Sequence, residues 1–131
     1  MISRRILIAA GLLGASLLVA PATFAAEKIA YTPATFDAAQ KAGRSILVEI
    51  HATWCPTCKA KAPILAALEQ DQKFKDLLVV RVDFDSQKEA VRRFGARVQS
   101  TLITFKGGQE TARSVGDTNR DSLAALLAKA I

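Results

Sequence analysis

The sequence predicts an α/β fold in which one mixed β-sheet carries helices on both faces. Residues 45–50 and 77–82 form apolar runs that are typical of strands buried on both sides. Residues 101–106 and 110–115 form two further strand patterns, and Gly107-Gly108 between them is typical of a hairpin turn. Because helical patterns alternate with the first strands, we expect a largely parallel sheet with one antiparallel edge.

Four helices are expected around this sheet. Thr32 and Pro33 suit the N-cap and the first turn of the first helix, and Gly43 suits its end. Pro63 lies inside the second helix and should kink it. Leucines repeat on one stripe of the last helix. The expected ranges are about 32–43, 58–70, 86–95 and 120–130.

The first 25 residues have the layout of a secretory signal peptide. Arg4 and Arg5 precede an apolar run over residues 6–20, and small residues follow it. The run is shorter than the roughly 20 residues that span a bilayer. We therefore expect export to the periplasm or another exported location, with cleavage after Ala25 and a single domain over residues 26–131.

Composition narrows the possible functions of this domain. The net charge is +6, but the cations are scattered over several segments and form no stripe for nucleic acid. A domain of this size buries a real core and needs no disulfide in order to fold. Since a disulfide between the two cysteines would close a very short loop, it would also add little stability. We therefore expect the cysteines to have a chemical role.

The two cysteines, Cys55 and Cys58, are spaced as CxxC at the start of a helix. Free N–H groups and the helix dipole favour an anion at that end, so a thiolate at Cys55 is stabilised. Lys59 and Lys61 add positive charge nearby. Cys58, one turn further, would be less exposed and would act as the resolving thiol. Such a pair exchanges disulfides: Cys55 attacks a substrate disulfide, and Cys58 then displaces the substrate.

Two other residues near the pair were considered. A structural zinc site wants four ligands, whereas the chain offers only the two cysteines and His51, so His51 receives no role and no metal is expected. Glu49 interrupts an apolar strand six residues before Cys55. If Glu49 is buried there, it could accept the proton of Cys58 as that thiol attacks. The alternative is a structural residue, which either reaches solvent at the end of the strand or pairs with Arg81 on the neighbouring strand.

These residues together resemble the thioredoxin family over nearly the whole length after the leader. Trp54-Cys-Pro-Thr-Cys-Lys59 is similar to the family's WCxxCK site, and Pro63 stands at its helix kink. The resemblance implies a catalytic role for Glu49, with Arg81 as its supporting partner. It also implies that Trp54 and Pro56 shape the substrate contact surface. Val115 and Gly116 match the groove that holds substrate backbone.

One position departs from the family. Where the family has a cis-proline facing the disulfide, this chain has Ser100, preceded by Gln99. A cis bond before a residue other than proline costs about 2.5–4 kcal/mol, so we expect a trans peptide and a rearranged loop. Gln99 would take the place of the residue that pairs with substrate. The smaller serine is expected to leave the thiols more open.

The resemblance implies an exported thiol–disulfide oxidoreductase that acts on protein thiols and disulfides. The cysteines carry the electrons, so no dissolved cofactor is expected. A neutral Thr57 beside Cys58 favours reduction or repair of disulfides, which in the periplasm would need a membrane electron donor. A monomer is expected. The alternative is a binding module of the same fold, either redox-inactive or carrying copper or zinc through Cys55 and Cys58, with His51 as a further ligand.

Overall fold

The computed structural model describes residues 15–20 and 25–131. Most of the predicted signal peptide, residues 1–25, lies outside the described residues. Among the helices that the structure does describe, none has the length and apolar content needed to cross a bilayer.

Five strands form one mixed sheet, as predicted. Their order across the sheet is β1-β3-β2-β4-β5. β1 and β2 both run parallel to β3, whereas β4 is antiparallel to β2 and β5 is antiparallel to β4. This arrangement places β2, the strand that leads to the cysteines, near the middle of the sheet. The strands are β1 Glu27–Ala30, β2 Ser45–His51, β3 Leu78–Asp83, β4 Thr101–Lys106 and β5 Gln109–Val115.

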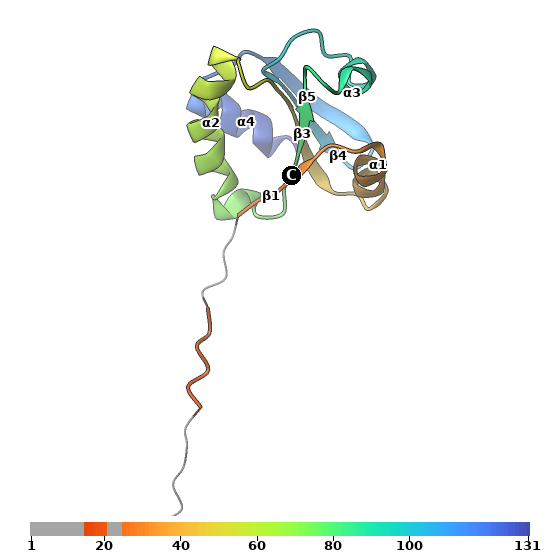
Figure 1. Ribbon diagram of the computed structural model, residues 1–131. Coiled ribbons are helices and arrows are strands. Elements are labelled where there is room, and N and C mark those ends of the chain that lie inside the picture. Colours follow the sequence, from red (N-terminus) through yellow and green to blue (C-terminus); the bar gives the residue numbers. More distant parts are fainter. Residues whose placement is uncertain (1–14, 21–24) are drawn as a thin grey trace, which may run out of the picture.

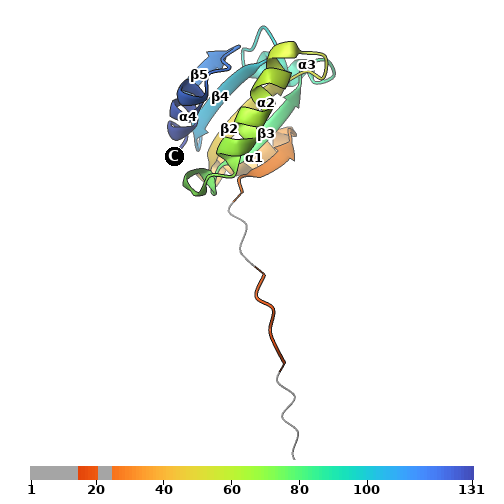
Figure 2. The same ribbon diagram turned by 90° about the vertical axis from the view of Figure 1, so that its left-hand side faces the viewer.

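Helices cover both faces of the sheet. In Figures 1 and 2, α2 and α4 lie on one face, and α1 and α3 lie on the other. The helices are α1 Pro33–Lys41, α2 Pro56–Glu69, α3 Lys88–Arg93 and α4 Arg120–Ala128, with a 3₁₀ turn, η1, at Gln72–Phe74. Thr32 caps α1 by accepting a hydrogen bond from the Thr35 amide, as its position before Pro33 predicts.

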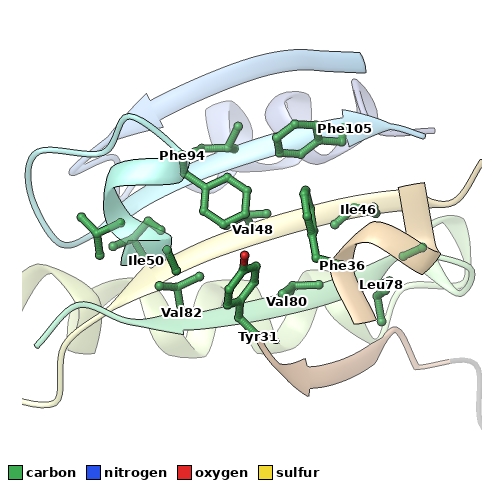
Figure 3. Close-up of a cluster of buried hydrophobic side chains, with 14 residues drawn as sticks. Tyr31, Phe36, Ile46, Val48, Ile50, Leu78, Val80, Val82, Phe94 and Phe105 are labelled. Carbon is green, nitrogen blue, oxygen red and sulfur yellow. The ribbon is translucent and has the colours of Figure 1, made fainter. Parts of the chain in front are cut away.

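Each face of the sheet has its own apolar core. Alternate residues of β2 point to opposite faces, so Val48 joins one cluster and Leu47 the other. Figure 3 shows the cluster under α1 and α3, where Phe36, Phe94 and Phe105 meet edge to face. Leu65 and Leu68 of α2 pack in the second cluster. Glu49 shares the face of Leu47, so it lies under α2.

Two features of the fold differ from the expected elements. β1 was not predicted, because its four residues are mostly exposed and show no apolar alternation. It forms only through parallel pairing with β3. α2 begins at Pro56 instead of near Cys58, because Cys55 acts as the N-cap and proline suits the first helical position. The helix continues through Pro63.

Candidate active site

Cys55 occupies the N-cap of α2. Its backbone is extended, with φ −78° and ψ 114°, and its Sγ accepts a hydrogen bond of 3.1 Å from the Cys58 amide. A sulfur in this position accepts a hydrogen bond from a first-turn N–H, which has no carbonyl partner within the helix. It also lies at the positive end of the helix dipole. The chain therefore places Cys55 where a thiolate is stabilised and Cys58 one turn further along.

Both thiols are unbridged and buried, and this corrects the expected exposure. Cys55 has 0% of its surface exposed and Cys58 has 5%, so Cys55 is not the more open of the two. Ala52 and the two cysteines form a small apolar cluster, and the Phe84 ring packs against it. The ring of Phe84 is held in turn by the Lys88 ammonium, 4.3 Å from its centroid. A substrate must therefore displace part of this cover to reach the sulfur of Cys55.

Burial sets the protonation of the resolving thiol. It raises the pKa of Cys58, and the hydrogen bond and charge of Cys55 raise it further. The Ala52 backbone and the nearby Ser100 hydroxyl act in the opposite direction but do not reverse the shift. Cys58 is therefore held as a neutral thiol in the dithiol form, and it must lose a proton before it can attack.

Glu49 is buried and paired under α2. The Arg81 guanidinium donates to its Oε1 at 3.2 Å, and the Lys28 ammonium lies 3.3 Å from its Oε2. Arg81 faces Glu49 directly across the parallel pair of β2 and β3, so the structural pairing considered from the sequence is present. Two cations therefore pair with this one buried carboxylate.

His51 belongs to this charged cluster and not to the cysteine pair. Its Nδ1 lies 3.8 Å from Glu49 Oε1. Burial, and next the charge of Arg81, lower the pKa of His51, so the imidazole is neutral at neutral pH. Residues 15–20 and 25–131 contain no group of three or more His, Cys, Asp or Glu side chains that could hold a metal ion.

The loop before β4 takes an unusual conformation at Ser100. Its peptide bond is trans, and its φ is +62°, the one positive value found for a residue other than glycine in the described part of the chain. The Ser100 amide donates to the Ile50 carbonyl at 2.8 Å, which a proline could not do. Ser100 is buried, so the serine does not open the site as expected. Backbone pairing and close packing, and not side-chain size, decide this conformation.

The remaining predicted contact residues surround the cysteines at the surface. Trp54 is 54% exposed, and its indole Nε1 donates to Asp85 at 2.7 Å, which fixes the ring beside Pro56. Gln99 is partly buried in the loop before Ser100. Val115 is exposed at the end of β5, and the amide of the next residue, Gly116, donates to the Ser100 carbonyl at 3.0 Å.

Lys61 is a site residue whose position the sequence analysis missed. Its side chain was expected only to add charge near the pair, but it is buried, and its Nζ donates to the Ser100 carbonyl at 2.9 Å. The helical period of α2 could have indicated that Lys61 is buried. Residues 58, 61, 65 and 68 form the inward stripe of α2, and Lys61 is the charged residue within it.

Comparison with known proteins agrees with this geometry. The thioredoxin family model matches residues 27–129. A thioredoxin of Chlamydia muridarum is 37% identical over 84 residues, which cover 64% of this chain and 80% of that protein. A thioredoxin of Mycobacterium tuberculosis is 38% identical over 80 residues, 61% of this chain and 68% of that protein.

Solved structures give the same result. Trxlp from Edwardsiella tarda EIB202 matches with a TM-score of 0.75 and 40% identity, covering 77% of this chain and 98% of that one. A thioredoxin of Nicotiana alata matches with a TM-score of 0.67 and 26% identity, covering 81% and 94%. The chain therefore belongs to the thioredoxin family. With a CxxC pair at a helix N-terminus, it is a thiol–disulfide oxidoreductase, and the predicted fold and class of enzyme are confirmed.

Proposed function

We propose that this enzyme is exported and reduces or repairs disulfides of protein substrates in the periplasm. The observation that carries the exchange chemistry is the hydrogen bond from the Cys58 amide to Cys55 Sγ, because it places that sulfur at the N-terminus of α2, a position typical of attacking cysteines. The dithiol form supplies the two electrons that reduce a substrate disulfide, so the chemistry itself uses no dissolved cofactor.

The reaction proceeds in two exchanges. The Cys55 thiolate attacks one sulfur of the substrate disulfide, forms a mixed disulfide and releases the other substrate sulfur as a thiolate. Cys58 then loses its proton and attacks Cys55, which releases the second substrate sulfur and leaves the enzyme disulfide. The substrate gains two electrons and, once its thiolates are protonated, two protons. Return to the dithiol needs an external reductant, for which a membrane electron donor is the class we propose.

Glu49 is the proposed acceptor of the Cys58 proton. Cys58 is the thiol whose pKa is raised by burial, so its deprotonation needs a base within the same buried region. Glu49 lies on the face of β2 that α2 covers, and α2 carries Cys58. Arg81 and Lys28 pair with the two oxygens of this carboxylate. Arg81 therefore supports the base without touching the substrate.

The surface around the thiols suits an extended polypeptide. Trp54, Val98 and Val115 are large apolar side chains that remain exposed, and they belong to the three segments that border the cysteines. Exposed apolar side chains gathered at one place mark binding surfaces. Gln99 and Gly116 would offer backbone groups to a substrate strand between them, with Pro56 at its edge.

Export is proposed from the leader and from a contact that Ala26 makes in the folded domain. The Ala26 amide donates to the Glu69 carbonyl at 2.7 Å, immediately after the expected cleavage at Ala25. The intact mass of the protein recovered from a periplasmic extract tests this point. A mass equal to that of a chain starting at Ala26 supports cleavage, whereas recovery of the uncleaved chain with the membranes contradicts it.

The central experiment is substrate trapping with Cys58→Ser in the native compartment. Without the resolving thiol, mixed disulfides between Cys55 and its partners should accumulate and be identified by mass spectrometry. Cys55→Ser serves as the matched control and should trap none. Reduction of insulin by the unsubstituted protein with dithiothreitol gives the second measurement. Failure both to trap partners and to accelerate insulin reduction would contradict the proposal.

A further inference from the structure

A lysine is buried directly behind the cysteine pair. Lys61 follows Cys58 by three residues and precedes Leu65 by four, so it lies on the inward stripe of α2. Only 2% of its surface is exposed. Lysine is among the residues least often buried unless it is paired, because its ammonium loses hydration. The burial of this ammonium group therefore needs a structural or functional explanation.

The ammonium has one fixed partner, which is a neutral one. Nζ donates to the Ser100 carbonyl at 2.9 Å. In the described part of the chain, no carboxylate lies within ion-pairing distance of it, although seven other ion pairs of lysine or arginine form there. Burial lowers the pKa of Lys61, and the opposing charges are those of Cys58, Glu49, Asp117 and Cys55, in that order.

These opposing groups are not equivalent. Glu49 is already paired with Arg81 and Lys28, and the Asp117 carboxylate accepts hydrogen bonds from Asn119 and Ser122. His51, also against Glu49, is neutral at neutral pH because burial lowers its pKa. Asp117 keeps its charge, but it forms no ion pair with Lys61, and Cys58 has the larger effect on the lysine. A thiolate in the pair would therefore be the main counter-charge of the buried ammonium.

Lys61 also holds the loop that faces the thiols. The Ser100 carbonyl accepts from Lys61 and from the Gly116 amide, while the Ser100 amide donates to Ile50. These three bonds tie the loop to α2, to the end of β5 and to β2. The tie to α2 depends on a side chain, so substitution of Lys61 removes it without changing the loop sequence. The lysine acts at the residue that stands in place of the family's proline.

We propose that Lys61 is a positioning residue for disulfide exchange, whose ammonium fastens the Ser100 loop to α2 and stabilises negative charge on the cysteine pair. The lysine keeps its proton throughout, and the electrons and protons move only between the sulfurs, Glu49 and the substrate. The inference rests on the exchange chemistry of Cys55 and Cys58, and it does not depend on compartment, substrate or direction of electron flow.

The direction in which Lys61 shifts the redox equilibrium depends on whether the dithiol or the disulfide form carries the negative charge. A thiolate exists in the dithiol form and not in the disulfide, so an ammonium that stabilises it favours the reduced enzyme. Removing the ammonium should therefore make the enzyme a stronger reductant. It should also move the formation of the reactive thiolate to higher pH, because less positive charge opposes protonation.

The test compares Lys61→Met with Lys61→Arg and Lys41→Met. Methionine keeps the length and the apolar stem, arginine keeps the charge and the donors, and Lys41 is an exposed lysine at the end of α1, on the other face of the sheet. Equilibrium with glutathione gives the enzyme's redox equilibrium constant. We expect Lys61→Met to shift it about 3- to 10-fold toward the disulfide, where tenfold corresponds to about 30 mV. Lys61→Arg should recover most of the shift, and Lys41→Met should stay within about twofold.

Two further readouts separate the two roles of Lys61. Cys55 alkylation measured against pH should move to higher pH in Lys61→Met and not in Lys41→Met. Hydrogen exchange of the Gly116 amide should become faster in Lys61→Met, because its acceptor carbonyl loses the tie to α2. Circular dichroism checks that the variant folds, which we expect because methionine removes a buried charge.

The results that would overturn this inference differ from those that would contradict the proposed function. A folded Lys61→Met protein with an equilibrium constant within twofold of the parent, an unchanged alkylation profile and unchanged Gly116 exchange would overturn the inference. If the unsubstituted protein reduces no insulin and traps no partner, the proposed function fails. The inference on Lys61 is still decided by the glutathione equilibrium, which needs only the cysteine pair.

Discussion

Glu49 and Arg81 face each other on neighbouring parallel strands, and the guanidinium donates a hydrogen bond of 3.2 Å to the carboxylate. A second cation, Lys28, holds the other oxygen at 3.3 Å. A buried carboxylate of the sheet is thus paired with two cations beneath the helix that carries Cys58. This arrangement is compatible both with support of the fold and with proton transfer, and kinetics can separate the two.

Glu49→Gln should slow the second exchange, in which Cys58 attacks the mixed disulfide. An amide keeps the shape but cannot take the proton, so we expect a loss of about 10²-fold, at the low end for a positioned base. Fluorescence of Trp54, the single tryptophan of the chain, can follow this step by stopped flow. Arg81→Met is the control, since it leaves Glu49 with Lys28 and should cost less. Resolution by Glu49→Gln at the parent rate would exclude the proton-transfer role.

Phe84→Ala should make Cys55 more reactive toward small reagents. The Phe84 ring packs against the cluster of Ala52, Cys55 and Cys58, and both thiols are buried beneath such cover. Removing the ring opens a path to the sulfur, so iodoacetamide alkylation at fixed pH should become severalfold faster. Phe84→Leu, which keeps an apolar side chain there, should react close to the parent rate. Equal rates for the alanine variant and the parent would show that other parts of the chain cover the thiol.

The value of φ at Ser100 gives a prediction for stability. A residue other than glycine costs about 1–2 kcal/mol in the left-handed region, and the buried Ser100 hydroxyl makes no hydrogen bond of good geometry, although it is near enough to Cys58 to lower the pKa of that thiol. Ser100→Gly removes both costs but loses more backbone entropy on folding, so we expect a net gain of up to about 1 kcal/mol in the free energy of unfolding. Urea denaturation measures it.

Ser100→Ala and Ser100→Pro complete this series. Alanine removes the hydroxyl but keeps the Cβ, so it should be less stable than the glycine variant. Proline fixes φ near −65° and cannot donate to the Ile50 carbonyl, so it should rearrange the loop and change substrate turnover markedly. If alanine proves as stable as glycine, backbone strain at Ser100 is negligible. Equal kinetics of the proline variant and the parent on several substrates would show that the position is neutral.

The sequence predicted the elements whose signals are local. Residues 45–50 and 77–82 are apolar runs, and the CxxC spacing with Trp54, Pro63 and Arg81 located the site within the family. β1 could not be predicted in this way, because Glu27–Ala30 becomes a strand only by pairing with β3, about 50 positions further along the chain. Elements that depend on a distant partner leave little pattern of their own.

The details of the site depended on packing that a linear reading does not contain. The CxxC spacing predicted that Cys55 lies at the N-terminus of a helix but not that it is buried, because Phe84 comes from the loop after β3. Lys61 was counted as a nearby charge because lysine is usually exposed, whereas the period of α2 directs it inward to Ser100. For this charged residue on an apolar helical stripe, the helical period indicated burial, whereas the usual exposure of lysine did not.

Glu69→Gln should stabilise the protein relative to the parent more at pH 7 than at pH 4. Glu69 is a buried residue at the C-terminal end of α2, where the helix dipole also disfavours a negative charge. Burial is the main cause that raises the pKa of Glu69 above its ordinary value of 4.5, although Lys28 at 3.5 Å opposes it. Neutralising this side chain therefore removes a cost that the parent carries only when the carboxyl is charged.

The sign follows from proton linkage. Between pH 4.5 and the raised pKa of Glu69, the folded state binds more protons than the unfolded state, so this group's contribution to stability falls as pH rises. Glutamine has no such fall. The carboxyls of Asp83 and Asp117, whose pKa values are lowered mainly by hydrogen bonds, titrate alike in both proteins and cancel in the difference. Glu89→Gln, at an exposed position of α3, controls for the loss of one charge. An identical difference in unfolding free energy at pH 4 and pH 7 would show that burial of Glu69 does not disfavour its charge.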